Sequence, residues 1–164
     1  MLSKDYTFAS ERLSYRGINE DDTELIVAWR NDSDNARNFF SKPPTLESHR
    51  NWFKQYLNDS NRYDFMIIDS DGEPIGTINL TDITKDSCDI GYMIGERTAR
   101  KKGYATEAVR AISKVAFDVF GVKQVRASIK PENIASEKVV AGGGFRKHKH
   151  VWVIDAPDSF FEQQ

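Results

Sequence analysis

The sequence predicts an α/β domain built on a mixed, mostly antiparallel sheet. Strand-like and helix-like patterns follow one another in the order strand, two helices, three strands, helix, strand, helix, strand. Two apolar runs flank an Asp71–Gly72 pair, as in a β-hairpin. A further run, Ile90–Ile94, leads through a basic turn into an amphipathic helix. The 164 residues suffice for one core, so we expect a single domain over residues 1–164.

The N-terminal part of the chain is predicted to form one strand and two helices. A loosely alternating stretch indicates the strand, and polar capping residues precede both main helical stretches. The Pro43–Pro44 pair stops any helix that precedes the second one. We expect a strand over Thr7–Arg16, a helix over Asp21–Arg30, a turn of helix around Asn35–Phe40 and a helix over Leu46–Leu57.

The remainder is predicted to hold the hairpin, three further strands and two helices. Apolar runs of strand length, bounded by turn-forming residues, indicate the strands. They are expected over Tyr63–Ile68, Pro74–Leu80, Cys88–Ile94, Val122–Ile129 and Phe145–Ile154. One helix lies within Glu96–Phe120, where apolar residues recur at spacings of three and four: Ala105, Ala108, Val109, Ile112, Ala116 and Val119. The other covers Ile134–Ala141 and ends at three consecutive glycines.

A short basic stretch carries the first functional signal. Arg100, Lys101, Lys102 and Gly103 lie between the strand that ends at Ile94 and the start of the long helix. The first N–H groups of a helix lack intrahelical partners and carry partial positive charge, so they bind anions. Glycine lets a ligand approach the backbone, and the cations add full charges. The stretch is neither a P-loop nor a dinucleotide fingerprint. We expect a diphosphate here, although most basic turns before helices bind nothing.

Composition and charge exclude several classes of function. The net charge of −2 gives no general attraction to nucleic acid, so the basic cluster Lys147–Lys149 does not predict a nucleic-acid partner. We expect no membrane partner, because no apolar run reaches spanning length and no signal peptide is visible. Cys88 is the only cysteine, which excludes an internal disulfide and suits the cytoplasm. His148 and His150 would share one strand face, but no third ligand is visible, so we expect no metal site.

Two motifs together resemble those of the GCN5-related N-acetyltransferases (GNAT). The first is Arg-x-x-Gly-x-Ala at Arg100–Ala105, and the second is Asn-x-x-Ser-x-x-Val at Asn133–Val139, followed by Gly144–Phe145. Their order and separation also match that family, and the resemblance covers residues 7–152. The stretches Glu11–Leu13 and Trp29–Asn31 resemble those of one branch of the family. This branch contains the ribosomal-protein N-terminal acetyltransferases and the amino-sugar acetyltransferases.

The resemblance implies a fold and a cosubstrate. In this family the sheet splays apart between two central parallel strands, and helices cover both of its faces. The pantetheine arm of acetyl-CoA lies in that gap and pairs with backbone groups of the first of these strands, and a nearby backbone N–H, of Met93 or Ile94, would donate to the developing oxyanion. The residues that would bind acetyl-CoA are Tyr92, Met93, Ile94, Arg100, Lys101, Lys102, Gly103, Tyr104, Ala105, Thr106 and Asn133. The family usually has a fuller last strand, which Phe160–Phe161 would supply, unless they cover a partner chain.

The resemblance also implies direct acetyl transfer to an amine and suggests catalytic residues. Many members place a tyrosine seven residues after the motif asparagine as proton donor, but this chain has Val140 there. In the branch that it resembles, the serine three residues after the asparagine has this role, here Ser136; the alternative is that Ser136 only caps or lines its helix. Glu96 and Asp89 flank the central strand and are the candidates for the base, or else surface or capping carboxylates.

Two classes of amine compete as the acceptor. An amino sugar on a nucleotide carrier would suit the end of the first predicted helix and the loop after it. Aromatic side chains there can stack on a base, and arginines can bind a diphosphate. A protein N-terminus is cationic and would favour acidic residues such as Asp32 and Asp34. We favour the sugar narrowly, in a monomer or homodimer, with a pocket lined by Trp29, Arg30, Asn31, Phe39 and Phe40. A sensor domain that binds acetyl-CoA without catalysis is the alternative of another class, supported only by the missing tyrosine.

Overall fold

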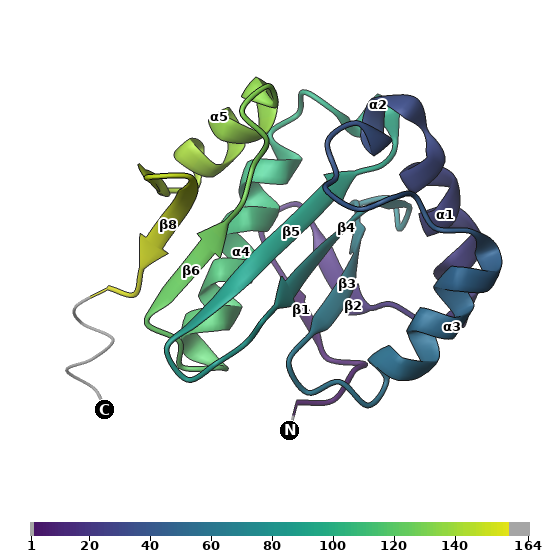
Figure 1. Ribbon diagram of the computed structural model, residues 1–164, viewed down its shortest axis with the longest axis horizontal. Helices are drawn as coiled ribbons and strands as arrows, with labels where there is room; N and C mark the ends of the chain where they lie inside the picture. The colour runs from purple at the N-terminus through teal and green to yellow at the C-terminus, as the bar shows by residue number, and fades with distance from the viewer. Residues whose placement is uncertain (1, 158–164) are drawn as a thin grey trace.

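The computed structural model describes residues 2–157, which form one eight-stranded sheet with helices on both faces (Figure 1). The strand order is β1-β2-β3-β4-β5-β6-β8-β7. Every neighbouring pair is antiparallel except β5 and β6, which are parallel. The strands are β1 Thr7–Ala9, β2 Ser14–Gly17, β3 Tyr63–Ile68, β4 Pro74–Thr81, β5 Ser87–Ile94, β6 Gln124–Ala127, β7 Arg146–His148 and β8 Val151–Asp155.

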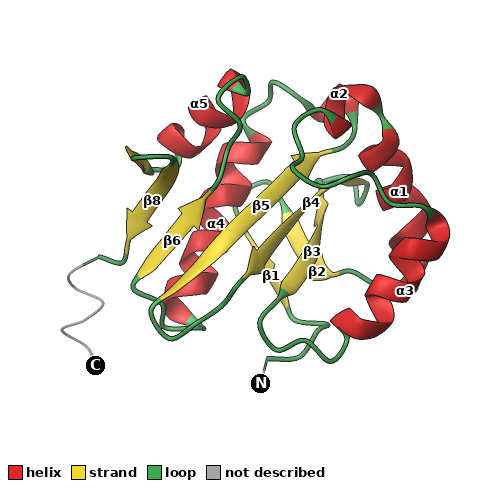
Figure 2. Ribbon diagram, in the orientation of Figure 1, coloured by secondary structure: helices red, strands yellow, loops and turns green. Residues whose placement is uncertain are grey.

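The helices form two groups, one on each side of the sheet (Figure 2). The long helix α4 and the shorter α5 pack on one face, and α1 and α3 pack on the other. Their bounds are α1 Thr23–Asn31, α2 Ser33–Ala36, α3 Leu46–Tyr56, α4 Tyr104–Asp118 and α5 Ile134–Gly142, with 3₁₀ turns η1 Glu20–Asp22 and η2 Arg97–Ala99. The predicted fold class is confirmed.

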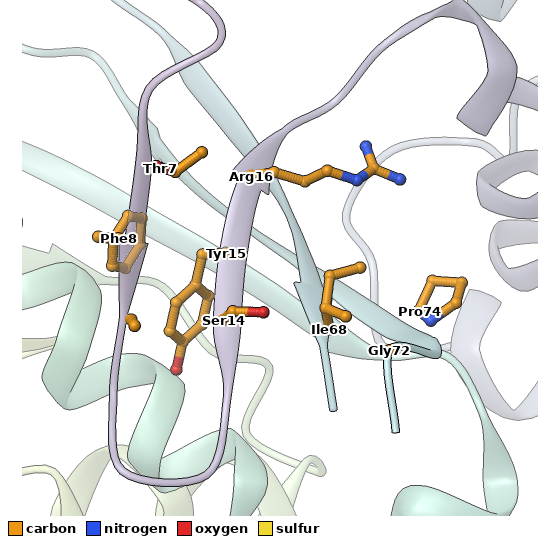
Figure 3. A pocket seen from close by; sticks show the side chains of 9 residues that line it. Thr7, Phe8, Ser14, Tyr15, Arg16, Ile68, Gly72 and Pro74 are labelled. Carbon is orange, nitrogen blue, oxygen red and sulfur yellow. The ribbon is translucent and has the colours of Figure 1, made fainter. Parts of the chain in front are cut away.

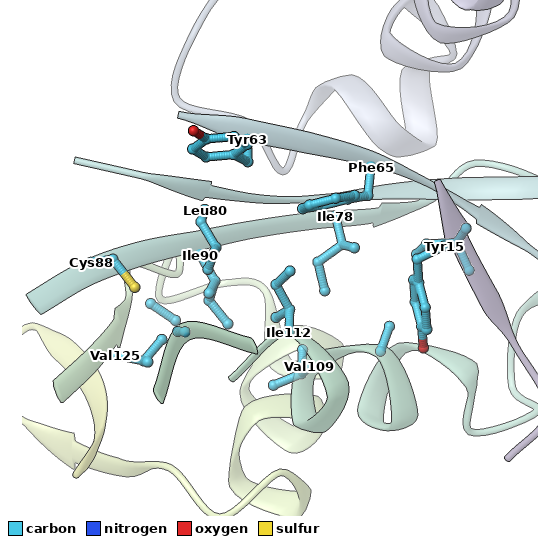
Figure 4. Packing of buried hydrophobic residues seen from close by; sticks show 14 of the residues in the cluster. Tyr15, Tyr63, Phe65, Ile78, Leu80, Cys88, Ile90, Val109, Ile112 and Val125 are labelled. Carbon is cyan, nitrogen blue, oxygen red and sulfur yellow. The ribbon is translucent and has the colours of Figure 1, made fainter. Parts of the chain in front are cut away.

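Two hydrophobic cores hold these layers together. The larger lies between the sheet and α4, where Val109 and Ile112 are fully buried against the strands (Figure 4). The smaller lies under α1 and α3. Because side chains alternate along a strand, β3 serves both cores: Phe65 faces the larger and Met66 the smaller. Cys88 lies in the larger core, where burial raises the pKa of its thiol to about 12.

The two parallel strands pair over a short distance only. Residues Ser87–Asp89 of β5 are in register with Gln124–Arg126 of β6. Beyond Asp89, no described strand pairs with β5 on that side, and β6 and the segment leading to α5 diverge from it (Figure 1). The C-terminal half of β5 therefore has an open edge, as a splayed sheet requires.

Both terminal strands predicted as single elements are hairpins. Thr7–Arg16 folds back on itself, because Ser10 N–H donates to the carbonyl of Leu13 at 2.9 Å and starts the antiparallel pair β1–β2. Phe145–Ile154 likewise divides into β7 and β8 around Lys149, whose φ of 57° reverses the chain. The two histidines at positions 148 and 150 consequently do not share a strand face.

Helix boundaries differ from prediction where side chains fold back on the backbone. The Asp22 carboxylate accepts the Asn19 N–H at 2.8 Å and pairs with Arg16, so a 3₁₀ turn precedes α1. Asp32 caps Ser33–Ala36, which places the next helical turn earlier than expected.

Three further expectations concern the ends of elements. Strand β6 ends at Ala127, two residues before the predicted end. Val119 was expected in the apolar stripe of α4 but is 43% exposed, because the helix ends just before it. The Phe160–Phe161 pair lies outside the described residues.

Within the described residues, no helix combines the length and apolarity needed to cross a membrane.

Candidate functional site

The loop before α4 has a backbone shape that suits an anion. Lys101 and Gly103 both adopt left-handed conformations, with φ of 61° and 78°. Left-handed residues alternating with others turn successive N–H groups toward one point, which forms an anion-binding nest. The N–H groups of Gly103, Tyr104, Ala105 and Thr106 donate to no other described residue. The first intrahelical bond is from Glu107 N–H to the Gly103 carbonyl. These amides fit the diphosphate of a CoA-type ligand.

The cations of this loop do not all face the same way. Lys101 and Lys102 are exposed beside the unpaired amides. Arg100, expected to join them, instead turns inward: its Nη2 donates to Asn35 Oδ1 at 2.7 Å and its Nε to the Ile94 carbonyl at 3.3 Å. Arg100 therefore ties the loop to β5 and α2.

The open edge of β5 exposes alternate backbone groups. Gly95 N–H donates to the carbonyl of Ile75 at the start of β4, and Met93 is in register with Thr77 of β4. Since successive residues of a strand point to opposite sides, the groups of Tyr92 and Ile94 face the gap and those of Met93 face β4. The Ile94 carbonyl is taken by Arg100, so the Ile94 N–H and the Tyr92 groups are the free ones. Met93 was expected to offer its backbone too, but its backbone groups face β4. Its side chain packs under α1 and α3.

The Tyr92 side chain bridges the opening of the sheet. Its hydroxyl donates to the Ser136 carbonyl, in the first turn of α5, at 3.2 Å. Burial raises the pKa of the Tyr92 phenol to about 12, so the group keeps its proton near neutral pH and acts as a donor. This bond fixes the start of α5 relative to the open strand.

Asn133 and Ser136 form a reciprocal cap at the start of α5. Asn133 Oδ1 accepts the Ser136 N–H at 3.2 Å, and its Nδ2 donates to Ser136 Oγ at 3.0 Å. Because Oγ accepts from Asn133, the hydroxyl proton of Ser136 is free to be donated elsewhere. The serine is thus both a capping residue and an available donor.

Glu96 is held at the end of β5 by Trp29. The indole Nε1 donates to Glu96 Oε1 at 2.9 Å. The ring lies so close to Gly95 that a Cβ there would come within 2.2 Å of it. Trp29 is only 5% exposed, so it supports Gly95 and Glu96 from the interior of the protein.

Asp89, the other predicted carboxylate, is the last residue of β5 that pairs with β6. It accepts from Arg126 Nε at 2.8 Å, directly opposite it in register. Burial raises the pKa of Asp89, and Arg126 partly opposes this shift. Its geometry is that of an ion pair that joins the two strands where they still touch.

The remaining predicted acceptor residues surround the loop after α2. The Arg30 guanidinium stacks on Phe39, 4.0 Å from the ring centroid, while Phe40 is 71% exposed. Lys130, after β6, lies 5.7 Å from the centre of the Phe40 ring and donates to the Arg37 carbonyl at 2.9 Å. The loop therefore reaches across the opening of the sheet. The Asn31 amide bonds to the carbonyls of Val27 and Pro44 and fixes the loop.

Two residues near the site were not singled out from the sequence. Asn35 is buried and links Arg100 to the Trp29 carbonyl. Arg12 contacts Lys102, Tyr104 and Glu107. Arg12 had a signal, since it stands within the Glu11–Leu13 motif used for the family resemblance; Asn35 had none.

Two surface hollows lie away from the opening of the sheet. One, of about 640 Å³, lies over the β1–β2 hairpin, where the rings of Phe8 and Tyr15 stack (Figure 3). The other, of about 940 Å³, follows the outer side of α4 from Gly103 and Arg12 to Val119. The described residues contain no cluster of three or more His, Cys, Asp or Glu that could hold a metal ion.

Comparison with known proteins identifies the family. The acetyltransferase (GNAT) domain model matches residues 12–146. An uncharacterised N-acetyltransferase, p20 of Bacillus licheniformis, is 28% identical over 86% of this chain and 83% of its own. The acetyltransferase PseH of Campylobacter jejuni is 26% identical over 90% of this chain and 88% of its own. An uncharacterised Methanocaldococcus jannaschii protein, MJ1062, is 29% identical over 84% of this chain, but this chain spans only 29% of its length.

Solved structures share the fold at lower identity. The spermidine N-acetyltransferase of Vibrio cholerae, in complex with CoA and spermine, superposes with a TM-score of 0.80 at 16% identity, over 88% of this chain and 93% of its own. The aminoglycoside acetyltransferase AAC(6')-Ib, in complex with coenzyme A and kanamycin, gives 0.78 at 18% identity, over 93% and 98%. With the family match, the expected enzyme class and cosubstrate are confirmed. The chain belongs to the GNAT acetyltransferase family and is an N-acetyltransferase with acetyl-CoA as its cosubstrate.

Proposed function

We propose that this enzyme acetylates the primary amine of an amino sugar carried on a nucleotide. The observation that supports this acceptor is the half-buried cation Arg30 at the end of α1, which has no counter-ion among the described residues. A nucleotide carrier would bring the diphosphate that neutralises such a cation, and a base that stacks on the nearby aromatic rings.

The Arg30 guanidinium is poorly satisfied within the described residues. Its Nη2 donates to Ser41 Oγ at 3.0 Å and to the Lys42 carbonyl at 3.4 Å, but no described carboxylate pairs with it. Its Nε is buried and has no described partner. Burial lowers the pKa of Arg30, which means that the surroundings disfavour its charge, yet a guanidinium does not deprotonate in proteins. An anionic acceptor would relieve this cost.

His49 on α3 adds a second free polar atom close to Arg30. It is 7% exposed, and its Nδ1 has no partner among the described residues. Burial lowers the pKa of His49 more than the charge of Asp64 raises it, and the charge of Arg30 adds to the lowering, so the imidazole is neutral at pH 7. A neutral imidazole beside a guanidinium suits a phosphate or a sugar hydroxyl.

The acidic residues that would favour a cationic peptide are already neutralised. Asp32 and Asp34 both pair with Arg97, at 3.0 and 3.2 Å. Arg97 also lowers the pKa of Asp32 through its hydrogen bond. The acceptor side of the site thus presents a free cation and no free carboxylate at these positions, which favours an anionic acceptor over a protein N-terminus.

The residues at the opening of the sheet divide the chemical work. Bound acetyl-CoA supplies the activated acetyl group. In our proposal the Ile94 N–H donates to the thioester oxygen as negative charge develops there. The Ser136 hydroxyl donates a hydrogen bond to the sulfur as the C–S bond breaks, and CoA leaves as a thiolate, which its pKa of about 8.5 permits. Glu96, oriented by Trp29, takes the proton of the amine through water as the C–N bond forms. Asp89 stays in its ion pair.

The acceptor is tested by thiol release from acetyl-CoA with three amines: a UDP-linked amino sugar, a peptide that starts with Ala or Ser, and spermidine. We expect turnover with the sugar only. Turnover with the peptide and none with the sugar would contradict the proposal. Turnover with spermidine and none with the sugar would contradict it in the same way.

Substitution of Arg30 by Gln tests the anion site. We expect KM for the UDP-linked sugar to rise about 10- to 100-fold, as for the loss of a hydrogen bond to a charged group, while KM for acetyl-CoA is unchanged. Arg50→Gln, on the exposed side of α3, is the matched control and should behave like the wild type. Equal effects of the two substitutions would show that Arg30 has no specific role.

Substitution of Ser136 by Ala tests the proton donor. We expect kcat to fall roughly 10- to 100-fold with the affinity for CoA retained, a modest loss because a thiol of pKa about 8.5 leaves readily. Ser60→Ala, in an exposed turn, is the control. An unchanged kcat would reduce Ser136 to a capping residue.

A further inference from the structure

Arg12, in the turn between β1 and β2, contacts the anion-binding loop from a distant part of the chain. Its Nη1 donates to the Lys102 carbonyl at 2.7 Å, and its guanidinium lies 4.7 Å from the centre of the Tyr104 ring. Its Nε and its backbone N–H donate to the two carboxylate oxygens of Glu107, at 2.7 and 2.9 Å. One side chain thus bridges the last residues of the loop and the first turn of α4.

We propose that Arg12 is a positioning residue for the diphosphate of acetyl-CoA. A trans peptide bond points its carbonyl and its N–H in opposite directions. When Arg12 holds the Lys102 carbonyl on its own side, the N–H of Gly103 must face away from it. The neighbouring free amides at the start of α4 then share that orientation. Arg12 acts on the ligand through the loop, and the amides make the contact.

The backbone at Gly103 explains why such a tie is needed. Gly103 has a φ of 78° and no side-chain cap, so the start of α4 is fixed by no contact of its own side chain. Glycine loses more conformational freedom on ordering than any other residue. A Cβ at Gly103 would lie 3.4 Å from Arg12 Nη2, so the guanidinium is directly against this residue. The tie therefore limits the motion of the peptide unit that matters most for the anion.

The charge of Glu107 gives an independent reason for this assignment. Burial alone would raise the pKa of Glu107, but hydrogen bonds from Ser10 and Arg12 outweigh burial and lower it. The carboxylate is therefore ionised one turn from a site for a diphosphate, where simple electrostatics opposes binding. Its three hydrogen bonds from the β1–β2 turn show what it does there: it fixes Arg12 and the turn to α4.

The test measures the Kd for CoA by calorimetry. The Kd for pantetheine, which lacks the diphosphate, is measured from its displacement of bound CoA. The variants are Arg12→Gln, Arg12→Lys and Glu107→Gln, with Arg146→Gln as control. Arg146 also pairs with a carboxylate, Asp155, but lies at the opposite edge of the sheet. No acceptor is needed, so the result is independent of the proposed acceptor. The thermal midpoint of each variant is recorded without ligand.

We expect Arg12→Gln to weaken CoA binding about tenfold and to leave pantetheine binding unchanged, as for the loss of one or two hydrogen bonds. Arg12→Lys should lose most of the effect as well, because one ammonium cannot bridge Lys102 and Glu107 together. If Arg12→Lys binds CoA like the wild type, the charge matters and the positioning does not. Equal weakening of both ligands, or of neither, overturns the proposal.

Glu107→Gln gives the sharpest distinction, since the two explanations predict opposite signs. Removing a negative charge beside the diphosphate should strengthen CoA binding if electrostatics alone acts. If Glu107 holds Arg12 in place, its loss should weaken CoA binding severalfold, while pantetheine binding stays the same. Stronger binding of CoA would refute the positioning role.

Discussion

The short parallel pairing between β5 and β6 is the constraint on which the site depends. The two strands are in register over three residues, Ser87–Asp89 with Gln124–Arg126, and then separate. The Asp89–Arg126 ion pair closes the paired end, and the hydroxyl of Tyr92 spans the open end to reach α5. The sheet is thus held at a fixed opening, which leaves backbone groups at Tyr92 and Ile94 free for the cosubstrate. An extended ladder would occupy those groups and remove the site.

A chain of hydrogen bonds joins the two halves of the site. Arg100, in the anion-binding loop, donates to the buried amide of Asn35, which donates to the Trp29 carbonyl, and the Trp29 indole donates to Glu96. The cosubstrate loop, the acceptor helix and the carboxylate at the end of β5 are therefore parts of one rigid arrangement. Buried polar groups of this kind are costly if one partner is lost, because the others are then left unsatisfied.

Local signals in the sequence were enough to predict the central part of the fold. The strand, basic turn and helix around Gly103 follow from apolar spacing and one glycine, and the Asn133 cap follows from residue type. The terminal hairpins were missed because their turns carry no strong turn signal: one is Ser10–Arg12, and the other depends on Lys149 in a left-handed conformation. The contacts of Arg12 and Arg100 join residues far apart in sequence, so no local pattern could reveal that one supports the loop and the other turns inward.

The most direct test follows the amide signals of the protein during titration with CoA. Our account predicts that the N–H signals of Gly103, Tyr104, Ala105 and Thr106 shift downfield at saturation, because these free amides receive the diphosphate. Gly103→Glu should abolish these shifts together with CoA affinity, since it adds a side chain and a negative charge at a position with φ of 78°. If CoA binds while these amides stay unchanged, or if Gly103→Glu binds CoA normally, the start of α4 is not the site and the account is wrong.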